Sequence, residues 1–461
     1  MNPSVPVVLA TSGLPGEDAL VHALDQANGP VTLSRRCLDL ADLLGAAATT
    51  PVQVALVDVR LRRLDRDAVA RLQVAGVAVV LLAAPDDESR ARALGADAVV
   101  VICVGSVDFD HVTAAVSAAA AQRAASGAPV EPPAAVGDRV REQAPVQHRR
   151  DTTPEPVRRG RLIAVWGPVG GPGRTGVALT LADEAARRGL RVWLVDADTT
   201  GPALAQRLGL LDDASGLAVA TRLAGAGRLT PADLARLAVA LPSGLRVLTG
   251  LARPERWSEL RPAALGVVWE HLVALADLVV VDVGAGLERD DETLLDPGLP
   301  SRHGAAVATL GCADAVVAVG AADPVGLVRL VRGLDVVGSA APTARCRVVV
   351  NRVRRSVAGD RAPAQIRKLL DDRLAHEPLL VPDEPAAWDA ALFAGLTLAE
   401  AAPRSASRAA LVGLVDVLVS ASPDPSQGPR PRIRRARTTR GAARRRRSGQ
   451  ASASTPGPAG A

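Results

Sequence analysis

Three local patterns follow one another without a break between Arg161 and Gly189. An apolar run predicts a buried strand, a glycine-rich segment predicts a tight turn, and an amphipathic segment predicts a helix. Glycine lets the backbone adopt positive φ and approach a ligand closely, so the N–H groups of the turn can point together at the positive end of the helix. The sequence therefore predicts a phosphate-binding loop. Its expected contacts are Gly170, Gly171, Pro172, Gly173, Arg174, Thr175 and Gly176.

Two residues at the end of this loop carry the side chains expected to act chemically. Thr175 stands where a hydroxyl can hold Mg²⁺, and Arg174 stands where a cation can hold phosphate. Because Lys368 is the only lysine of the chain, composition alone also accounts for an arginine at position 174. A guanidinium is planar and wider than an ammonium, so we expect phosphate binding with slow hydrolysis. If Arg174 cannot stabilise the charge that develops on the phosphate in the transition state, the rate of hydrolysis falls by about 10²–10³-fold.

The loop resembles the deviant Walker A sequence of the MinD/ParA ATPases, G-K-G-G-x-G-K-T, which falls on residues 168–175. Val169 stands at the family's signature lysine and Arg174 stands at its Walker lysine. In that family the signature lysine reaches the nucleotide of a second subunit. The resemblance therefore implies an ATP-dependent homodimer in which another cation takes this place, with Arg174 and Arg302 as the candidates.

Three aspartates end apolar runs later in the chain. Asp196 and Asp198 close RVWLVDAD, and Asp282 closes LVVVD. Ligands of open α/β sheets bind outside such carboxyl ends of strands. The first two residues resemble the family's switch I pair, and the third resembles its Walker B aspartate. The resemblance implies that Asp198 orients the attacking water, with Arg174 as the second catalytic residue. It also implies that Thr175, Asp196 and Asp282 hold Mg²⁺.

Two segments further downstream resemble the family's base-binding region. Asn351 lies in RVVVNRV and matches the asparagine that reads the adenine edge. On local grounds, a polar residue that caps a strand explains Asn351 equally well. Pro382 and Asp383 match the family's V-P-x-D pattern loosely, because the aspartate follows the proline directly. The resemblance implies that these two residues form the wall on the base side.

Composition and periodicity divide the chain into four parts. Residues 125–159 are rich in proline and charge without periodicity, which is typical of a disordered linker, and residues 422–461 form an arginine-rich tail that cannot bury a core. Residues 160–421 predict an α/β domain with a mostly parallel sheet of about seven strands and helices on both faces, and the MinD/ParA resemblance implies that this domain is a P-loop NTPase. Residues 1–124 predict a smaller flavodoxin-like α/β domain.

The first domain resembles a response-regulator receiver, with Asp58 ending a strand in the phosphoacceptor's place. The chemistry of a receiver is missing, because Ala10, Thr11 and Ser12 occupy the position of its metal-binding acidic pair. We therefore expect Asp58 to be a loop carboxylate and the domain to serve docking or dimerisation. The degenerate receiver followed by an ATPase-like domain resembles the CpaE branch of the MinD/ParA superfamily, which positions pilus, secretion or division machinery.

Composition excludes several other classes of protein. The best candidate for a membrane span, residues 305–322, is interrupted by Asp314, so no spanning helix is expected. The N-terminus shows no signal-peptide pattern and the cysteines lack metal spacing, which favours a cytoplasmic protein with reduced thiols. The tail from Arg430 to Arg447 can contact nucleic acid or an anionic membrane non-specifically, the latter giving a peripheral location on the cytoplasmic face of the plasma membrane. A solubilising extension without a specific partner is the alternative.

Two functions of different class follow from these patterns. The first is a slow ATPase that uses ATP and Mg²⁺, is activated by dimerisation, and positions pilus or secretion, septum or chromosome-partitioning machinery. The second is a nucleotide-binding pseudo-ATPase scaffold that acts on a protein partner through its receiver-like domain. A weaker third hypothesis is a DNA-binding partitioning protein whose tail supplies the contacts.

Overall fold

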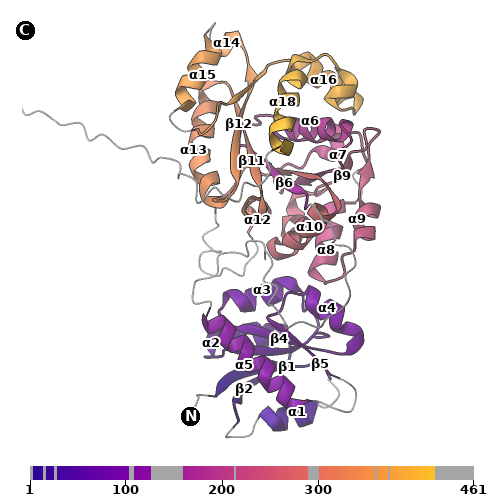
Figure 1. Cartoon of the computed structure of the whole chain (residues 1–461), viewed down its shortest axis with the longest axis vertical. Coiled ribbons are helices and arrows are strands. Elements are labelled where there is room, and N and C mark those ends of the chain that lie inside the picture. Colours follow the sequence, from indigo (N-terminus) through magenta and orange to yellow (C-terminus); the bar gives the residue numbers. More distant parts are fainter. Residues whose placement is uncertain are drawn as a thin grey trace, which may run out of the picture.

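The computed structural model describes residues 4–13, 17–24, 29–102, 108–125, 159–211, 214–288, 301–358, 361–371 and 374–420. Figure 1 shows two α/β bodies stacked along the long axis, with the N-terminal body at the lower end. Residues 126–158 of the expected linker and the whole of the expected tail, 422–461, lie outside the described residues.

The N-terminal body is built on a five-stranded sheet in which all the paired strands are parallel. The strand order is β2-β1-β3-β4-β5, which is the order of a flavodoxin-like sheet, the fold class predicted for this body. The strands are β1 (Val5–Ala10), β2 (Val31–Cys37), β3 (Val54–Asp58), β4 (Ala78–Ala83) and β5 (Ala98–Val101). The helices are α1 (Glu17–Leu24), α2 (Leu40–Thr49), α3 (Arg66–Val74), α4 (Glu88–Ala93) and α5 (Phe109–Ala125), with a 3₁₀ turn η1 (Pro85–Asp87).

Apolar runs at residues 5–10, 54–59, 77–82 and 98–104 predict four of these strands, and β2 is the one that the sequence does not predict. It lies at the edge of the sheet, and only its two end residues, Val31 and Cys37, are buried. Ser34, Arg35 and Arg36 between them are exposed. An edge strand of this kind carries little of the apolar pattern by which a half-buried strand is recognised.

The C-terminal body contains an eight-stranded sheet in the order β13-β12-β11-β6-β10-β7-β9-β8. Its strands pair in parallel except for β8, which pairs antiparallel with β9. The sequence predicted about seven strands, and the additional β8 has two residues that are both exposed. The strands are β6 (Arg161–Trp166), β7 (Val192–Ala197), β8 (Val239–Ala240), β9 (Arg246–Leu248), β10 (Leu278–Val283), β11 (Ala315–Ala321), β12 (Arg345–Val353) and β13 (Leu379–Pro382).

Helices cover both faces of this sheet, as the fold class predicts (Figure 1). On one face the core includes α6 (Arg174–Arg187) and α18 (Ala406–Ser420). On the other it includes α8 (Gly216–Gly225), α10 (Pro262–Leu275), α12 (Gly304–Cys312) and α13 (Pro324–Ala340). The remaining elements are α7 (Leu204–Arg207), α9 (Pro231–Leu237), η2 (Pro254–Glu259), α14 (Arg355–Ala358), α15 (Ala362–Asp371), α16 (Pro385–Ala394) and α17 (Leu398–Ala401).

The central strands are buried on both faces, which explains why they read as continuous apolar runs in the sequence. All six residues of β10 are buried, including its one charged residue, Asp282. Because β6, β7, β10 and β11 are parallel neighbours, their carboxyl ends meet at one edge of the sheet. That edge carries the phosphate loop and the aspartates predicted to act with it.

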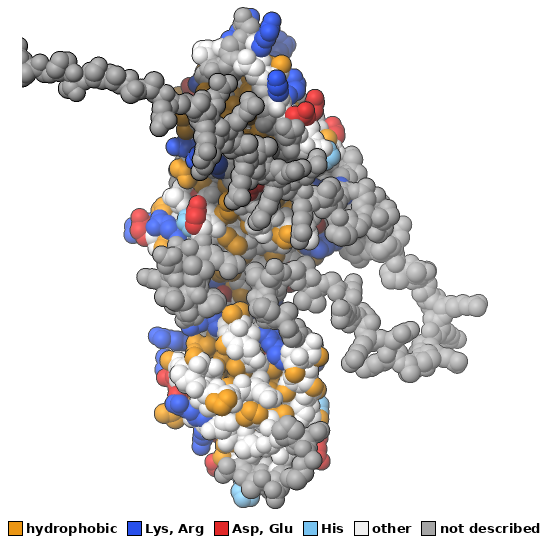
Figure 2. Space-filling view, turned by 90° about the vertical axis from the view of Figure 1, so that its left-hand side faces the viewer, with side chains coloured by type: hydrophobic (Ala, Val, Ile, Leu, Met, Phe, Trp, Pro, Cys, Tyr) orange, Lys and Arg blue, Asp and Glu red, His pale blue; other side chains and the backbone are white. Residues whose placement is uncertain are grey.

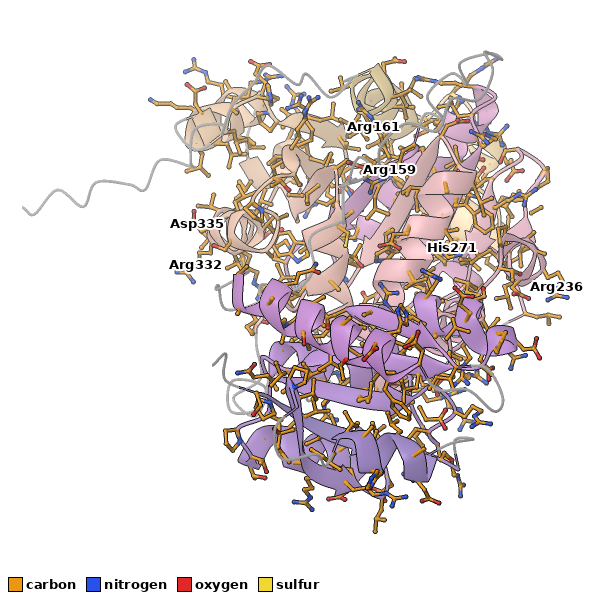
Figure 3. The ribbon with its side chains drawn as sticks, turned by 60° about the horizontal axis from the view of Figure 1, so that its bottom comes forward. Arg159, Arg161, Arg236, His271, Arg332 and Asp335 are labelled. Carbon is orange, nitrogen blue, oxygen red and sulfur yellow. The ribbon has the colours of Figure 1, made fainter. Side chains whose placement is uncertain are left out.

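The two bodies meet where α3 packs against α8 and α10 (Figures 1 and 3). Arg261, at the start of α10, donates from Nη1 to Asp65 Oδ2 at 2.8 Å, and Asp67 Oδ2 lies 3.8 Å from the same nitrogen. Burial raises the pKa of Asp67 to about 6, with a smaller contribution from the neighbouring Asp65. The receiver-like body is therefore fixed by charged groups as well as by helix packing.

No helix among the described residues is both long and apolar enough to cross a membrane. The apolar run at residues 305–322 is divided between helix α12 and strand β11, with Asp314 between them. Asp314 accepts a hydrogen bond from the Leu162 N–H at 2.8 Å, so the residue that interrupts the run also joins β6 to its surroundings.

Candidate functional site

The predicted phosphate loop joins β6 to α6 and has the conformation that its glycines allow. Gly170, Gly171 and Gly173 have φ values of 121°, 61° and 94°. A Cβ atom at Gly173 would lie 2.4 Å from Nδ2 of Asn351, so both the backbone angle and the available space require glycine there. Val169, at the crown of the loop, is 71% exposed.

Arg174 folds back toward the protein at the end of this loop. Its Nη1 donates to the Gly167 carbonyl oxygen at 2.8 Å, and its Nη2 donates to Asp198 Oδ2 at 2.8 Å. The side chains of this ion pair are 16% and 4% exposed. The guanidinium fork that a phosphate would engage is thus occupied by a loop carbonyl and a carboxylate.

Asp198 has a full set of hydrogen-bond partners. Besides accepting from Arg174 through Oδ2, it accepts through Oδ1 from the N–H groups of Thr200 at 2.8 Å and Gly201 at 3.1 Å. A Cβ at Gly284 would lie 3.0 Å from the same Oδ1. The residue predicted to orient water is therefore held between the segment after β7 and the segment after β10.

Asp196 faces the backbone that follows it. Oδ2 accepts from the N–H groups of Ala203 at 2.9 Å and Leu204 at 3.0 Å, and Oδ1 accepts from the N–H of Asp198 at 3.2 Å. These bonds cap the start of α7 and fix the turn that carries Asp198. Asp196, a predicted metal ligand, therefore uses both carboxylate oxygens to hold the backbone of the turn that carries Asp198.

Asp282 is the least satisfied carboxylate at this edge of the sheet. Both of its side-chain oxygens are buried without a hydrogen-bond partner. Burial, and secondarily the neighbouring Asp196, raises the pKa of Asp282 to about 8, while Thr175 and Arg174 lower it in part. Burial also raises the pKa of Asp196, but its three N–H donors stabilise the charged form, so the proton of this pair resides on Asp282.

Orphaned oxygens beside a hydroxyl fit a small divalent cation. Mg²⁺ takes oxygen ligands, and in phosphate sites one or two carboxylates and the substrate phosphates often suffice. Among the described residues no group of three histidine, cysteine or acidic side chains forms a complete metal cage. Asp282 and Thr175 therefore fit a cation that arrives with a phosphate ligand, rather than one held by protein alone.

Asn351 lies at the carboxyl end of β12 and uses both ends of its amide within the protein. Nδ2 donates to the Pro172 carbonyl oxygen at 2.9 Å, and Oδ1 accepts from the Arg352 N–H at 2.9 Å. The residue predicted to read an adenine edge thus holds the phosphate loop in place. Of the two explanations open from the sequence, this geometry favours a capping and positioning contact.

Pro382 and Asp383 lie at the end of β13, two strands beyond β11. The Pro382 carbonyl accepts from Ser407 Oγ at 2.9 Å, and Asp383 Oδ2 accepts from Arg354 Nη1 at 3.1 Å. The two partners, Ser407 and Arg354, come from neighbouring segments. Because β13 pairs with β12, Pro382 and Asp383 lie at the same sheet edge as Asn351.

Three residues near the loop were not identified from the sequence. Arg329 on α13 donates from Nη1 to the Val169 carbonyl at 3.1 Å. Trp388 on α16 covers the start of α6, because a Cβ at Gly176 would lie 2.9 Å from its ring. Burial lowers the pKa of Arg207, which interacts electrostatically with Asp282. No local signal marks these residues, since only the fold brings them to the loop.

Arg302, a predicted candidate for the missing cation, lies in the segment before α12. Its backbone carbonyl accepts from Thr199 Oγ1 at 2.8 Å. This bond joins the segments that follow β7 and β10, next to Asp198. The structure therefore places the backbone of Arg302 beside the segment that carries Asp198.

Asp58 in the N-terminal body is fully buried and well paired. It accepts from the Arg60 N–H at 2.9 Å, from the Arg60 Nε and Nη2 atoms at 3.3 Å, and from the Ser12 N–H at 3.3 Å. This is the position of a phosphoacceptor in a receiver, but an arginine occupies its oxygens. The sequence predicted a loop carboxylate at a strand end, whereas Asp58 is the last residue of β3 and its carboxylate is buried, because these hydrogen bonds satisfy it inside the fold.

The model of the CobQ/CobB/MinD/ParA nucleotide binding domain matches residues 163–393. The chain belongs to this family. The match begins within β6 and includes the loop, the aspartates and β13, so the α/β fold and the MinD/ParA resemblance drawn from the sequence are confirmed. No curated protein matches the chain.

Solved structures of MinD and ParA proteins are among those similar to part of this chain. The cell division ATPase MinD of Pyrococcus furiosus is 23% identical, with a TM-score of 0.45, and the match covers 57% of this chain and 99% of that one. MinD of Pyrococcus horikoshii OT3, complexed with Mg-ADP, is 20% identical, with a TM-score of 0.43 and coverage of 56% and 96%. A ParA family ATPase from Chlorobium tepidum TLS is 18% identical, with a TM-score of 0.45 and coverage of 55% and 98%.

Proposed function

We propose that this MinD/ParA-family chain binds Mg²⁺-ATP at its phosphate loop and hydrolyses it slowly. The observation that carries the proposal is Asp282, whose two buried oxygens have no partner although Thr175 and the loop lie beside it. An unpaired buried carboxylate costs free energy in the native state. A cation bound with a nucleotide phosphate at this position would remove that cost.

The proposed roles follow the positions of the side chains. The loop backbone from Gly170 to Gly176, together with Arg174, would hold phosphates, and Thr175 and Asp282 would hold Mg²⁺. When bound, Mg²⁺ would neutralise phosphate charge. Asp196 would position the turn that carries Asp198. Asn351, Pro382 and Asp383 would lie on the base side of the loop.

The ion pair between Arg174 and Asp198 supports slow turnover. Asp198 can orient a water molecule through Oδ2 only after that oxygen is released from Arg174, and a phosphate must engage the same guanidinium. Breaking one side of a buried pair without replacement costs about 3–5 kcal/mol. Phosphate binding would supply the replacement for Arg174, so nucleotide binding and the release of Asp198 are coupled.

A second candidate function is a nucleotide-binding scaffold without useful turnover. The same ion pair favours it, because both residues expected to act in catalysis satisfy each other. In this case, nucleotide binding would change the segments after β7 and β10 without cleavage. The measurement that separates the two candidates is phosphate release.

The biological role that we propose is positioning of a pilus or secretion, septum or chromosome-partitioning apparatus, as in the CpaE-like branch. The receiver-like body would contact the protein partner, because Asp58 is satisfied and offers no phosphorylation chemistry. We propose further that the protein is cytoplasmic and that nucleotide binding supports its homodimer. Arg174 and Arg302 remain candidates for the cation that reaches the second subunit.

Anionic surfaces are the proposed targets of the basic parts of the chain. Figure 2 shows basic side chains at the upper end of the molecule, where α14 and α15 lie in Figure 1. The exposed ones in this region include Arg354, Arg355, Arg361, Arg367 and Lys368. With the arginines from Arg430 to Arg447, they would favour peripheral contact with an anionic membrane or with nucleic acid.

Calorimetric titration of the full chain with Mg²⁺-ATP, followed by a phosphate-release assay, tests the proposal. The ATPase predicts binding and slow release, with both reduced in Arg174→Ala. Binding without release would select the scaffold. Absence of binding would reject both functions and leave the loop without a nucleotide role.

A further inference from the structure

A pocket lies on the outer side of the phosphate loop, against β11 and the beginning of α13. Its volume is about 180 Å³. One wall consists of loop residues, and the other wall includes Ala321, Asp323 and Arg329. The loop residues are Pro168, Val169, Gly170 and Pro172. The pocket lies on the β11 side of β6, whereas Asp282, near the end of β10, and Asp198, just after β7, lie on the other side of β6.

Arg329 reaches from α13 to the loop along this pocket. Its Nη1 donates to the Val169 carbonyl at 3.1 Å. At Gly170 any Cβ would lie 2.6 Å from the same Nη1, so the glycine creates the space in which the guanidinium rests against the loop. The neighbouring loop residue, Val169, has an uncharged side chain.

The electrostatics of the pocket leave this guanidinium available. Asp323 is the carboxylate that lines the pocket, and its Oδ1 accepts from the Gly326 N–H at 2.9 Å to cap α13. Within the described parts of the chain, Arg329 forms no ion pair, and the Val169 carbonyl is its one hydrogen-bond acceptor. A guanidinium with free N–H groups in a fixed fork matches the geometry of a phosphate.

We infer that Arg329 binds the terminal phosphate of the nucleotide from the outer side of the loop and makes the site selective for a triphosphate over a diphosphate. This inference rests on the proposed nucleotide function. It adds a cation from α13 of the same chain to the phosphate site, beside the roles proposed above for Arg174 and Arg302. The loop and α13 thus form two sides of one phosphate-binding site.

The test is calorimetric titration of the full chain with Mg²⁺-ATP and with Mg²⁺-ADP, for the native protein and for Arg329→Ala. A lost charge-assisted hydrogen bond weakens binding by about 10- to 100-fold. We expect a loss of this size for ATP, with the dissociation constant for ADP unchanged within about twofold. Arg329→Lys, which keeps the charge without the fork, should recover part of the ATP affinity.

Arg332→Ala is the matched control. Figure 3 shows Arg332 and Asp335 at the outer side of α13, directed away from the rest of the protein. This variant removes an exposed arginine from the same helix, and we expect it to retain both affinities.

Three results would overturn the inference. Equal losses for ATP and ADP in Arg329→Ala would make Arg329 a residue that only positions the loop. Unchanged affinities for both nucleotides would remove it from the site. If the native protein binds neither nucleotide, the proposed function fails, and this inference fails with it.

Discussion

The two bodies of this chain place an aspartate at the carboxyl end of a central parallel strand, but they treat it differently. Asp58 ends β3 and accepts hydrogen bonds from Arg60 and from the Ser12 backbone. Asp282, near the end of β10, has no partner for either oxygen. A carboxylate that the protein itself satisfies is structural, whereas one left unsatisfied beside a phosphate loop fits an external cation. We therefore expect different roles for two aspartates at the same sheet position.

The largest expected effect is on folding stability. Asp58→Ala removes a buried carboxylate and leaves its N–H donors unpaired, which should lower the free energy of unfolding of the N-terminal body by about 3 kcal/mol. Asp282→Asn at pH 7 replaces a mostly protonated carboxyl by a similar amide and should change stability by less than about 1 kcal/mol. Urea unfolding followed by tryptophan fluorescence reports on the C-terminal body alone, because all five tryptophans lie there. Far-UV circular dichroism reports on both bodies. Equal losses of unfolding free energy in the two variants would contradict the view that the protein satisfies Asp58 but not Asp282.

The next effect concerns turnover at the loop. Arg174→Lys replaces the fork that engages Gly167 and Asp198 by a compact ammonium, which cannot hold both groups in the same way. Phosphate release at saturating Mg²⁺-ATP should rise by about 10²-fold. Arg332→Lys is the control for a general effect of the exchange. A rate that stays the same or falls in Arg174→Lys would show that the ion pair does not limit the reaction.

A third effect concerns the pH dependence of Mg²⁺-ATP affinity, which should depend on Asp282 and not on Asp58. Because the native pKa of Asp282 is raised to about 8, from an unfolded value of 3.8, the proton favours the folded state. The contribution of this protonation to the free energy of unfolding is complete below the unfolded pKa and is lost as pH rises through about 8. A cation needs the deprotonated carboxylate, so Mg²⁺-ATP affinity should fall about tenfold for each pH unit below 8. Calorimetry at several pH values should show this slope in the native protein and in Asp58→Asn, but not in Asp282→Asn.

The smallest effect lies between the bodies. Arg261→Ala removes a half-exposed partner of Asp65, and pairs of this kind contribute about 0.2–1 kcal/mol. The unfolding free energy of the N-terminal body should fall by this amount at neutral pH, with Arg253→Ala as the exposed control. A loss of several kcal/mol would mean that the interface depends on this pair more than on the packing of α3 against α8 and α10.

Local sequence predicted much of the fold and the location of the site, and the reason is physical. Glycines with positive φ and apolar strands that end in aspartate are short-range patterns, so the loop, Asp198 and Asp282 were found without the fold. Strand β2 escaped prediction because its polar residues face solvent at an edge.

Contacts between distant segments were outside the reach of such patterns. Arg174 and Asp198 form an ion pair across 24 positions, Asn351 binds Pro172 across 179, and Arg329 binds Val169 across 160. Each pair depends on how the parallel strands order their carboxyl ends. The sequence therefore predicted which residues gather at the edge, but not which of them already satisfy one another.

The most direct test of the account compares ATP binding by the full chain with and without Mg²⁺, for the native protein and for Asp282→Asn. If Asp282 is the carboxylate that awaits a cation, Mg²⁺ should strengthen ATP binding to the native protein by about 10- to 100-fold and should have little effect on the variant. Asp58→Asn should behave as the native protein does. Equal Mg²⁺ dependence in the native protein and Asp282→Asn would contradict the account, because the unpaired carboxylate would then have no part in binding the metal.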